Sequence, residues 1–164
     1  MARILIVGGG ARARALATEL GRAGHAVRMT TRTEAGRSAI EQTGAECWIG
    51  TPDRIASLRY ALEGVTIACW LLGTASGTDE EVAALHGPRL AFFCSQAIDT
   101  TVRGLVYEAA GCVAGELLEA GADLVATTAA FNEIPLRIIR ADPADEPAWL
   151  AQAQDSIGAL LAAG

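Results

Sequence analysis

The sequence predicts an α/β fold: a doubly wound, mostly parallel sheet of about seven strands with helices on both faces, in three αβα layers. Two observations predict it. Short apolar runs typical of buried strands alternate with helical patterns along the chain of 164 residues. The first of these runs ends in three glycines that lead directly into a helix. A chain of this length is expected to form one domain, residues 1–164.

The strands and helices follow one another at regular intervals. Strands are expected at residues 4–7, 26–29, 46–49, 65–72, 90–94, 102–108 and 135–140. Helices are expected between the first two strands and at residues 34–43, 52–62, 79–85, 115–131 and 146–162. This alternation favours parallel strands joined by right-handed crossovers. The strand at 102–108 is expected to follow its predecessor without the usual long crossover helix.

The glycines after the first strand fit a dinucleotide-binding fingerprint. Gly8-x-Gly10-x-x-Ala13 has the spacing GxGxxG/A, and it lies between a strand and a helix in a βαβ unit. Gly8 permits the tight turn, Gly10 lets the backbone approach the pyrophosphate, and Ala13 keeps the helix close to the strand. The helix start then offers unpaired N–H groups and a positive dipole end. The expected cofactor loop is Gly8, Gly9, Gly10, Ala11, Arg12 and Ala13. The alternative is a glycine turn that only joins a strand to a helix.

The end of the second strand favours NADP over NAD. Dinucleotide folds that bind NAD place an acid there, about 20 residues after the glycines, for the ribose hydroxyls. This chain has Thr30, Thr31 and Arg32 instead. A guanidinium pairs with a 2′-phosphate, so Thr31 and Arg32 are predicted to bind it, with Arg12 flanking the same phosphate. The alternative makes Arg12, Arg14 and Arg32 solvated surface charges. The missing acid also counts against FAD and S-adenosylmethionine.

Charge and composition narrow the class of protein. All 13 basic residues are Arg, and residues 1–60 hold nine of them against five acids, which suits a polyanionic cofactor. The net charge of −6 argues against general nucleic-acid binding. No apolar stretch has the length of a membrane span, and the first one is interrupted by glycines. We expect a soluble, cytoplasmic protein, and the apolar composition is compatible with a homodimer.

Cysteine and histidine spacing gives no support for a metal site. The two histidines are far apart, and the four cysteines form no CxxC pair. Three of the cysteines fall in apolar runs, where Cys usually acts as a small buried hydrophobe. No metal is therefore expected. The cysteines are Cys47, Cys69, Cys94 and Cys112.

Two loops are expected at the carboxyl ends of strands, where ligands bind in such sheets. Residues 73–78 follow the fourth strand, and Gly73 and Thr74 are predicted to contact the pyrophosphate or ribose; the alternative is an ordinary connection. Ser95 and Gln96 follow the fifth expected strand and are predicted to line a substrate pocket. The other residues expected against a substrate are Thr100, Thr101, Tyr107 and Glu108, of which Tyr107 and Glu108 are candidate acid and base. The alternative for Tyr107 is a packed aromatic.

Residues 3–32, the turn at 50–53 and residues 61–73 resemble atypical and extended short-chain dehydrogenase/reductases. The resemblance is closest to the nucleoside-diphosphate-sugar epimerase-like and NmrA-like NAD(P)-binding proteins with Rossmann folds, and it covers about residues 3–95. It implies that the glycine loop, Arg32, Gly73 and Thr74 contact the cofactor. Where this chain has Thr51, that family often has an Asp near the adenine.

The chain departs from that family in its catalytic residues. Active members use a Tyr-x-x-x-Lys pair, and this chain has no Lys; Tyr107 is followed four residues later by Gly111. Arg does not replace that Lys, because its pKa is too high to tune. Two functions remain: an NADP-dependent oxidoreductase with an atypical site, or a non-catalytic NADP(H)-binding redox sensor or regulatory module. A Rossmann-like domain with an empty site is the third alternative.

Overall fold

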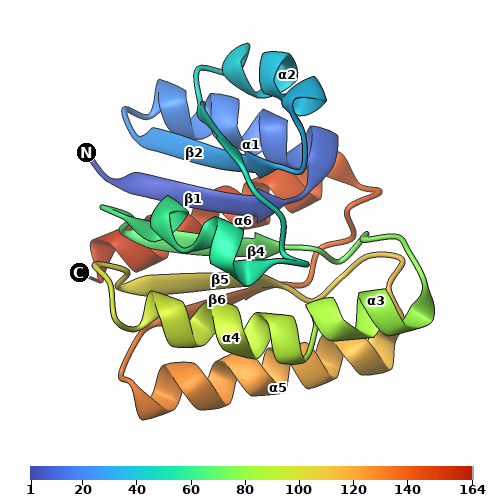
Figure 1. Cartoon of the computed structure of the whole chain (residues 1–164). Coiled ribbons are helices and arrows are strands. Elements are labelled where there is room, and N and C mark those ends of the chain that lie inside the picture. Colours follow the sequence, from blue (N-terminus) through green and yellow to red (C-terminus); the bar gives the residue numbers. More distant parts are fainter. Residues whose placement is uncertain (164) are drawn as a thin grey trace.

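A computed structural model describes residues 1–163, which contain one sheet of six parallel strands (Figure 1). The strands are β1 (Arg3–Gly8), β2 (Ala26–Thr31), β3 (Glu46–Ile49), β4 (Ile67–Leu71), β5 (Gly104–Glu108) and β6 (Leu136–Ile139). Their order in the sheet is β3-β2-β1-β4-β5-β6. The doubly wound parallel sheet is confirmed, with six strands in place of about seven. The strand order reverses between β1 and β4, so the crevice at their carboxyl ends is where such sheets bind ligands.

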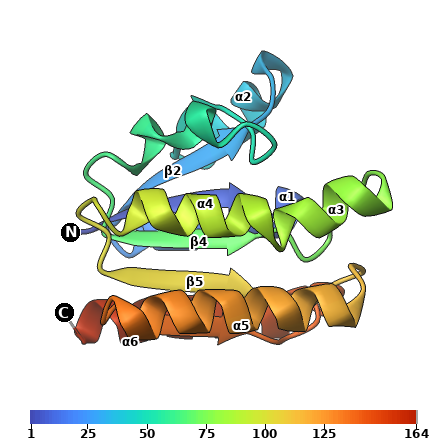
Figure 2. The same ribbon diagram turned by 60° about the horizontal axis from the view of Figure 1, so that its bottom comes forward.

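Helices cover both faces of the sheet. They are α1 (Gly10–Arg22), α2 (Arg37–Glu41), α3 (Asp79–Leu85), α4 (Pro88–Ala97), α5 (Gly115–Phe131) and α6 (Glu146–Ala162). The helices α1 and α6 pack together on one face of the sheet. On the other face, which is turned toward the viewer in Figure 2, α4 and α5 are in contact. Across residues 1–163, none of the helices combines the length and the apolar character that crossing a bilayer requires.

The sheet is buried on both faces, which explains its continuous apolar strands. In β1, Ile4 and Ile6 belong to the core beneath α1 and α6, whereas Leu5 and Val7 belong to the core beneath α4 and α5. All four side chains are fully buried. Alternate residues of a strand point to opposite faces, so a strand covered on both sides shows no polar alternation.

The strand expected at residues 90–94 is wrong, because these residues belong to α4. Five apolar residues fit a buried strand and a buried helix equally well. The helix begins with Pro88 at its first position, where proline is well tolerated. Leu90, Phe93 and Cys94 face the core, while Phe92 is 51% exposed. The crossover expected to be absent before β5 is therefore present, formed by α3 and α4.

Two further segments differ from the prediction. Residues 52–62 form the short 3-10 turns η2 (Ile55–Leu58) and η3 (Tyr60–Leu62), and residues 34–43 form η1 (Glu34–Gly36) and α2. The buried guanidinium of Arg28 donates to the backbone oxygens of Ala61 and Glu63, which ties this irregular segment to β2. The helices predicted at 115–131 and 146–162 are confirmed as α5 and α6.

All four cysteines are free thiols, and their burial differs. Cys69 and Cys94 are buried in the core, Cys47 is half-buried, and Cys112 is exposed. Within residues 1–163, no group of three or more His, Cys, Asp or Glu side chains gathers as a metal site would require.

The helix α5 approaches β5 closely at Gly121. A Cβ atom at this position would overlap the Tyr107 hydroxyl and lie 2.7 Å from its Cζ atom. Tyr107 is itself fully buried, so it has no free space into which to move.

We therefore expect Gly121→Ala to destabilise the protein by about 1–3 kcal/mol, the usual cost of overpacking a core. Gly158→Ala in α6 is the matched control, since a Cβ there meets no atom within 4 Å. It should be neutral or stabilising by up to about 1 kcal/mol through helix propensity. Urea unfolding of the two variants measures both values, and equal effects would contradict the close approach.

Candidate functional site

The glycine loop lies at the carboxyl end of β1, beside the crevice between β1 and β4. A Cβ atom at Gly8 would overlap the Leu72 side chain and lie 2.7 Å from the Leu71 carbonyl oxygen, and one at Gly9 would overlap the Cβ of Ala13. Gly10 differs, because a Cβ there meets no atom within 4 Å. Gly8 and Gly9 are thus required by packing within the chain, while Gly10 borders open space.

The start of α1 offers free hydrogen-bond donors at this open space. Its N-cap is Gly9, in the left-handed conformation with φ of 93°, and no side chain caps the helix. Gly10 and Ala11 are exposed, and no acidic residue lies in the first turn. The first N–H groups of a helix lack intrahelical partners, and together with the helix dipole they favour an anion.

Two cavities flank the loop and share Arg32. The first, which we call the arginine cavity, measures about 250 Å³ and lies between the ends of β1 and β2. The second, the β4-loop cavity, measures about 460 Å³ and lies against the residues after β4. The arginine cavity is lined by residues that include Gly8, Gly10, Arg14, Thr31 and Arg32. The β4-loop cavity is lined by Gly9, Arg32, Leu71, Leu72, Thr74, Ala75 and Ser76.

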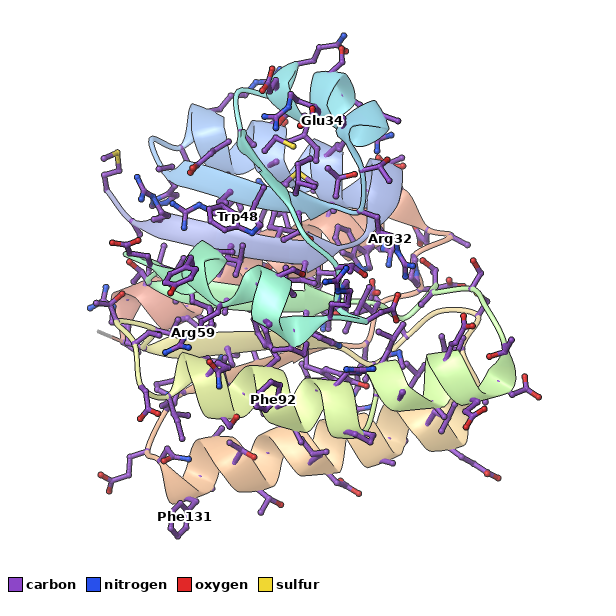
Figure 3. The ribbon with its side chains drawn as sticks, viewed as in Figure 1. Arg32, Glu34, Trp48, Arg59, Phe92 and Phe131 are labelled. Carbon is purple, nitrogen blue, oxygen red and sulfur yellow. The ribbon has the colours of Figure 1, made fainter. Side chains whose placement is uncertain are left out.

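Arg32 projects from the end of β2 at the edge where the strands end (Figure 3). Its Nη1 atom lies 2.8 Å from Oδ2 of Asp53, which follows β3. Both side chains are partly in solvent, 60% exposed for Arg32 and 39% for Asp53. Arg32 is therefore accessible to a ligand while already paired with a carboxylate.

Arg14 is the charged residue of the arginine cavity that the predicted site did not include. It lines this cavity with Arg32, and its guanidinium forms no ion pair with any of residues 1–163. One signal was available: Arg14 lies one helical turn after Gly10, so both residues share a face of α1.

The sequence predicted that Arg12 would flank a phosphate beside Arg32, but the Arg12 guanidinium is bound elsewhere. Its Nε and Nη2 atoms donate to the carboxylate of Glu108 at 2.9 and 2.6 Å, and its Nη1 donates to the Gly9 oxygen and to the Thr74 hydroxyl. The guanidinium also lies over the Trp149 ring, 5.4 Å from its centroid. Arg12 is thus turned toward β5, away from the arginine cavity, and holds the glycine loop to its neighbours.

Glu108 is a completely buried carboxylate with four donors. Besides the two bonds from Arg12, it accepts from the Gly73 backbone N–H at 2.8 Å and from Nε1 of Trp149 at 2.7 Å. The Gly73 carbonyl oxygen in turn accepts from the N–H of Val113 at 3.0 Å. Both backbone groups of Gly73 are therefore used inside the protein, whereas Thr74 is exposed and its hydroxyl accepts from Arg12.

Tyr107 and Glu108 point to opposite faces of the sheet, as successive strand residues do. Tyr107 is buried beneath α4 and α5, and its hydroxyl lies 2.6 Å from Nδ1 of His86. His86 Nε2 lies 3.0 Å from the Leu72 carbonyl oxygen, which only accepts, so Nε2 donates to it and neutral Nδ1 accepts from Tyr107. Burial, with the nearby Glu108 charge, raises the pKa of Tyr107 above its usual value. The predicted acid and base therefore do not share a pocket.

The residues predicted to line a substrate pocket lie at the amino ends of the strands, opposite to the end that carries the glycine loop. The helix α4 runs back along β4, so its last residues reach the amino ends of the strands (Figure 2). The Ser95 hydroxyl donates to the Phe92 carbonyl oxygen at 2.6 Å. Gln96 lines a cavity of about 570 Å³ together with Thr100 and Thr101. The structure does not bring this group together with the glycine loop, because residues 90–94 form a helix in place of the expected strand.

We expect Glu108→Gln to cost about 3–5 kcal/mol in the free energy of unfolding, as is typical when one partner of a buried ion pair is removed. The Gln side-chain NH₂ group would also point its hydrogens at N–H groups that can only donate. Glu119→Gln is the matched control, because Glu119 pairs with Arg140 at an exposed site, where such pairs contribute about 0–1 kcal/mol. Urea unfolding at neutral pH compares them, and similar losses would contradict the role of Glu108.

The buried His86 should make stability fall in acid. Desolvation lowers the pKa of His86 in the folded protein, so the unfolded chain binds the proton more readily. This contribution is fully present above the unfolded pKa of about 6.5 and is lost as the pH falls below it. Unfolding free energies between pH 7.5 and 5 should therefore decline more steeply for the wild type than for His86→Gln. Equal slopes would show that His86 does not titrate on unfolding.

In sequence comparisons, no protein-family model and no curated protein matches the chain. Solved structures do match. A putative NAD-dependent epimerase/dehydratase from Bacillus halodurans is 17% identical with a TM-score of 0.72, over 87% of this chain and 71% of that one. A short-chain dehydrogenase/reductase superfamily protein from Agrobacterium tumefaciens with bound NAD is 19% identical with a TM-score of 0.69, over 84% of this chain and 48% of that one. The fold of this chain is similar to that of these two proteins.

The triphenylmethane reductase of Citrobacter sp., solved with NADP(H), gives a TM-score of 0.65 at 18% identity, over 84% of this chain and 48% of that one. This chain thus spans about half the length of the reductase and of the Agrobacterium protein. The family resemblance of the sequence is confirmed at the level of the fold.

Proposed function

We propose that this protein binds a nicotinamide dinucleotide in the crevice between β1 and β4, with NADP(H) preferred over NAD(H). The observation that carries the proposal is the open face of Gly10 above the uncapped start of α1. Gly8 and Gly9 are in close contact with neighbouring residues of the chain. Gly10 leaves room for a ligand at the place where free N–H groups and the positive end of the helix dipole favour an anion. Structures of similar fold with bound NADP(H) and with bound NAD support a dinucleotide without deciding between the two.

The residues present fit such a cofactor. The pyrophosphate would lie against the N–H groups at the start of α1, with the Thr74 hydroxyl on the other side of the crevice. Gly8, Gly9, Ala13 and Arg12 shape the loop, and Gly73 anchors the segment after β4. A bound nicotinamide supplies hydride chemistry.

The arginine cavity is proposed as the 2′-phosphate site. Arg14 has no ion-pair partner among residues 1–163, and Arg32 and Thr31 line the same cavity. Hydrogen bonds to charged groups contribute about 1.5–3 kcal/mol each, so one good contact separates NADP from NAD by roughly tenfold or more.

A second candidate is a non-catalytic NADP(H)-binding sensor or regulatory module. It is favoured over an oxidoreductase by the burial of Tyr107 and Glu108, whose polar atoms are engaged inside the core. An oxidoreductase built on this chain would need its proton donor elsewhere at the crevice. Both candidates share the same cofactor site.

Calorimetric titration with NADPH, NADP⁺, NADH and NAD⁺ tests the proposal. Arg14→Ala should weaken NADPH binding by roughly tenfold, and Arg32→Ala should weaken it less, because Arg32 is already paired with Asp53. Both variants should leave NADH binding nearly unchanged, because only NADPH carries the 2′-phosphate. Arg22→Ala is the control, since it removes the same charge from the far end of α1. Binding of none of the four nucleotides would refute the proposal, and equal losses for NADPH and NADH would refute the 2′-phosphate site.

A further inference from the structure

The end of β2 lacks the acid that NAD-binding folds place there, but Asp53, from another part of the chain, places a carboxylate beside it. It lies in the turn after β3, its backbone N–H donates to the Thr51 hydroxyl at 3.2 Å, and that hydroxyl is 3.3 Å from Asp53 Oδ2. The same Oδ2 atom lies 2.8 Å from Nη1 of Arg32. The acid is therefore held in a local turn and directed across the sheet edge at Arg32.

Arg32 is the residue on which this pairing acts, because it lines both the arginine cavity and the β4-loop cavity. A phosphate that approached Arg32 would share the guanidinium with a carboxylate of the same charge sign. A ribose 2′-hydroxyl meets no such repulsion and has a hydrogen to donate to the carboxylate. Arg14, in the same cavity, has no ion-pair competitor among residues 1–163.

We propose that Asp53 is a specificity-determining residue that reduces the preference of this site for a 2′-phosphate by engaging Arg32. The inference rests on the proposed function and deepens it. Arg14 is then the principal 2′-phosphate ligand and Arg32 a partly neutralised second one. Both members of the Arg32–Asp53 pair are exposed to water, so the pair opens at low cost. Asp53 therefore moderates the preference for NADP and keeps NAD acceptable.

The test uses two ligands that differ only in the 2′-phosphate, adenosine 2′,5′-bisphosphate and 5′-AMP, titrated calorimetrically into the whole protein. Asp53→Asn keeps an oxygen for the Thr51 hydroxyl and removes the charge. It should tighten bisphosphate binding by about fivefold and leave 5′-AMP binding unchanged or weaker. Asp99→Asn is the matched control, because it removes one exposed acid that lines the cavity at the amino ends of the strands. It should leave the ratio of the two affinities unchanged.

The same substitution in an Arg32→Ala background tests whether Asp53 acts through Arg32. Most of the fivefold gain should disappear there. The inference is overturned if Asp53→Asn leaves the affinity ratio unchanged, if Asp99→Asn changes it equally, or if the full gain persists without Arg32. A wild-type protein that binds neither ligand refutes the proposed function itself, which is distinguishable from an affinity ratio that does not move. Thermal melting verifies that each variant is folded.

Discussion

The buried carboxylate of Glu108 is the constraint on which the crevice depends. An uncompensated charge in the interior costs several kcal/mol, so the chain must bring donors to it. It does so from three elements: Arg12 in the first turn of α1, Gly73 after β4 and Trp149 in α6. The Arg12 guanidinium then reaches on to Thr74, so the two walls of the crevice are joined through one ion pair. Together with the direct pairing of β1 and β4, this ion pair holds the glycine loop to the segment after β4.

Residues that are neighbours in sequence have different roles: some make contacts inside the protein, and others line the cavities of the proposed ligand site. Within the loop, Gly9 packs against the helix α1, whereas Gly10 borders open space. In α1, Arg12 points toward β5, while Arg14 lines the cavity beside β2. After β4, Gly73 uses both backbone groups internally. A residue's type and its place in a motif therefore do not decide which duty it performs.

Local patterns predicted the parts of the fold that form between neighbours in sequence. The β1-α1-β2 unit and the helices α5 and α6 follow from periodicity and glycine placement. The short apolar run at residues 90–94 carries no such information, and its misassignment moved Ser95 and Gln96 to the wrong edge of the sheet. The duty of Arg12 was not predictable, because its partner Glu108 lies 96 residues away. The opposed faces of Tyr107 and Glu108, in contrast, could have been predicted from strand alternation, yet the prediction from sequence placed both residues against one substrate as acid and base.

The hydrogen bond between Trp149 and Glu108 has a consequence for the order in which parts of the protein fold. The glycine loop, its helix and the second strand are contiguous in sequence and form a local unit. Arg12 acquires its partner only when β5 has joined the sheet, and Glu108 acquires its indole donor only when α6 has docked. Contacts of such sequence separation form late because loop closure is costly. During synthesis, the hydrogen bonds that hold the crevice are therefore complete only after the last helix has docked, although none of the residues that line the two cavities belongs to that helix.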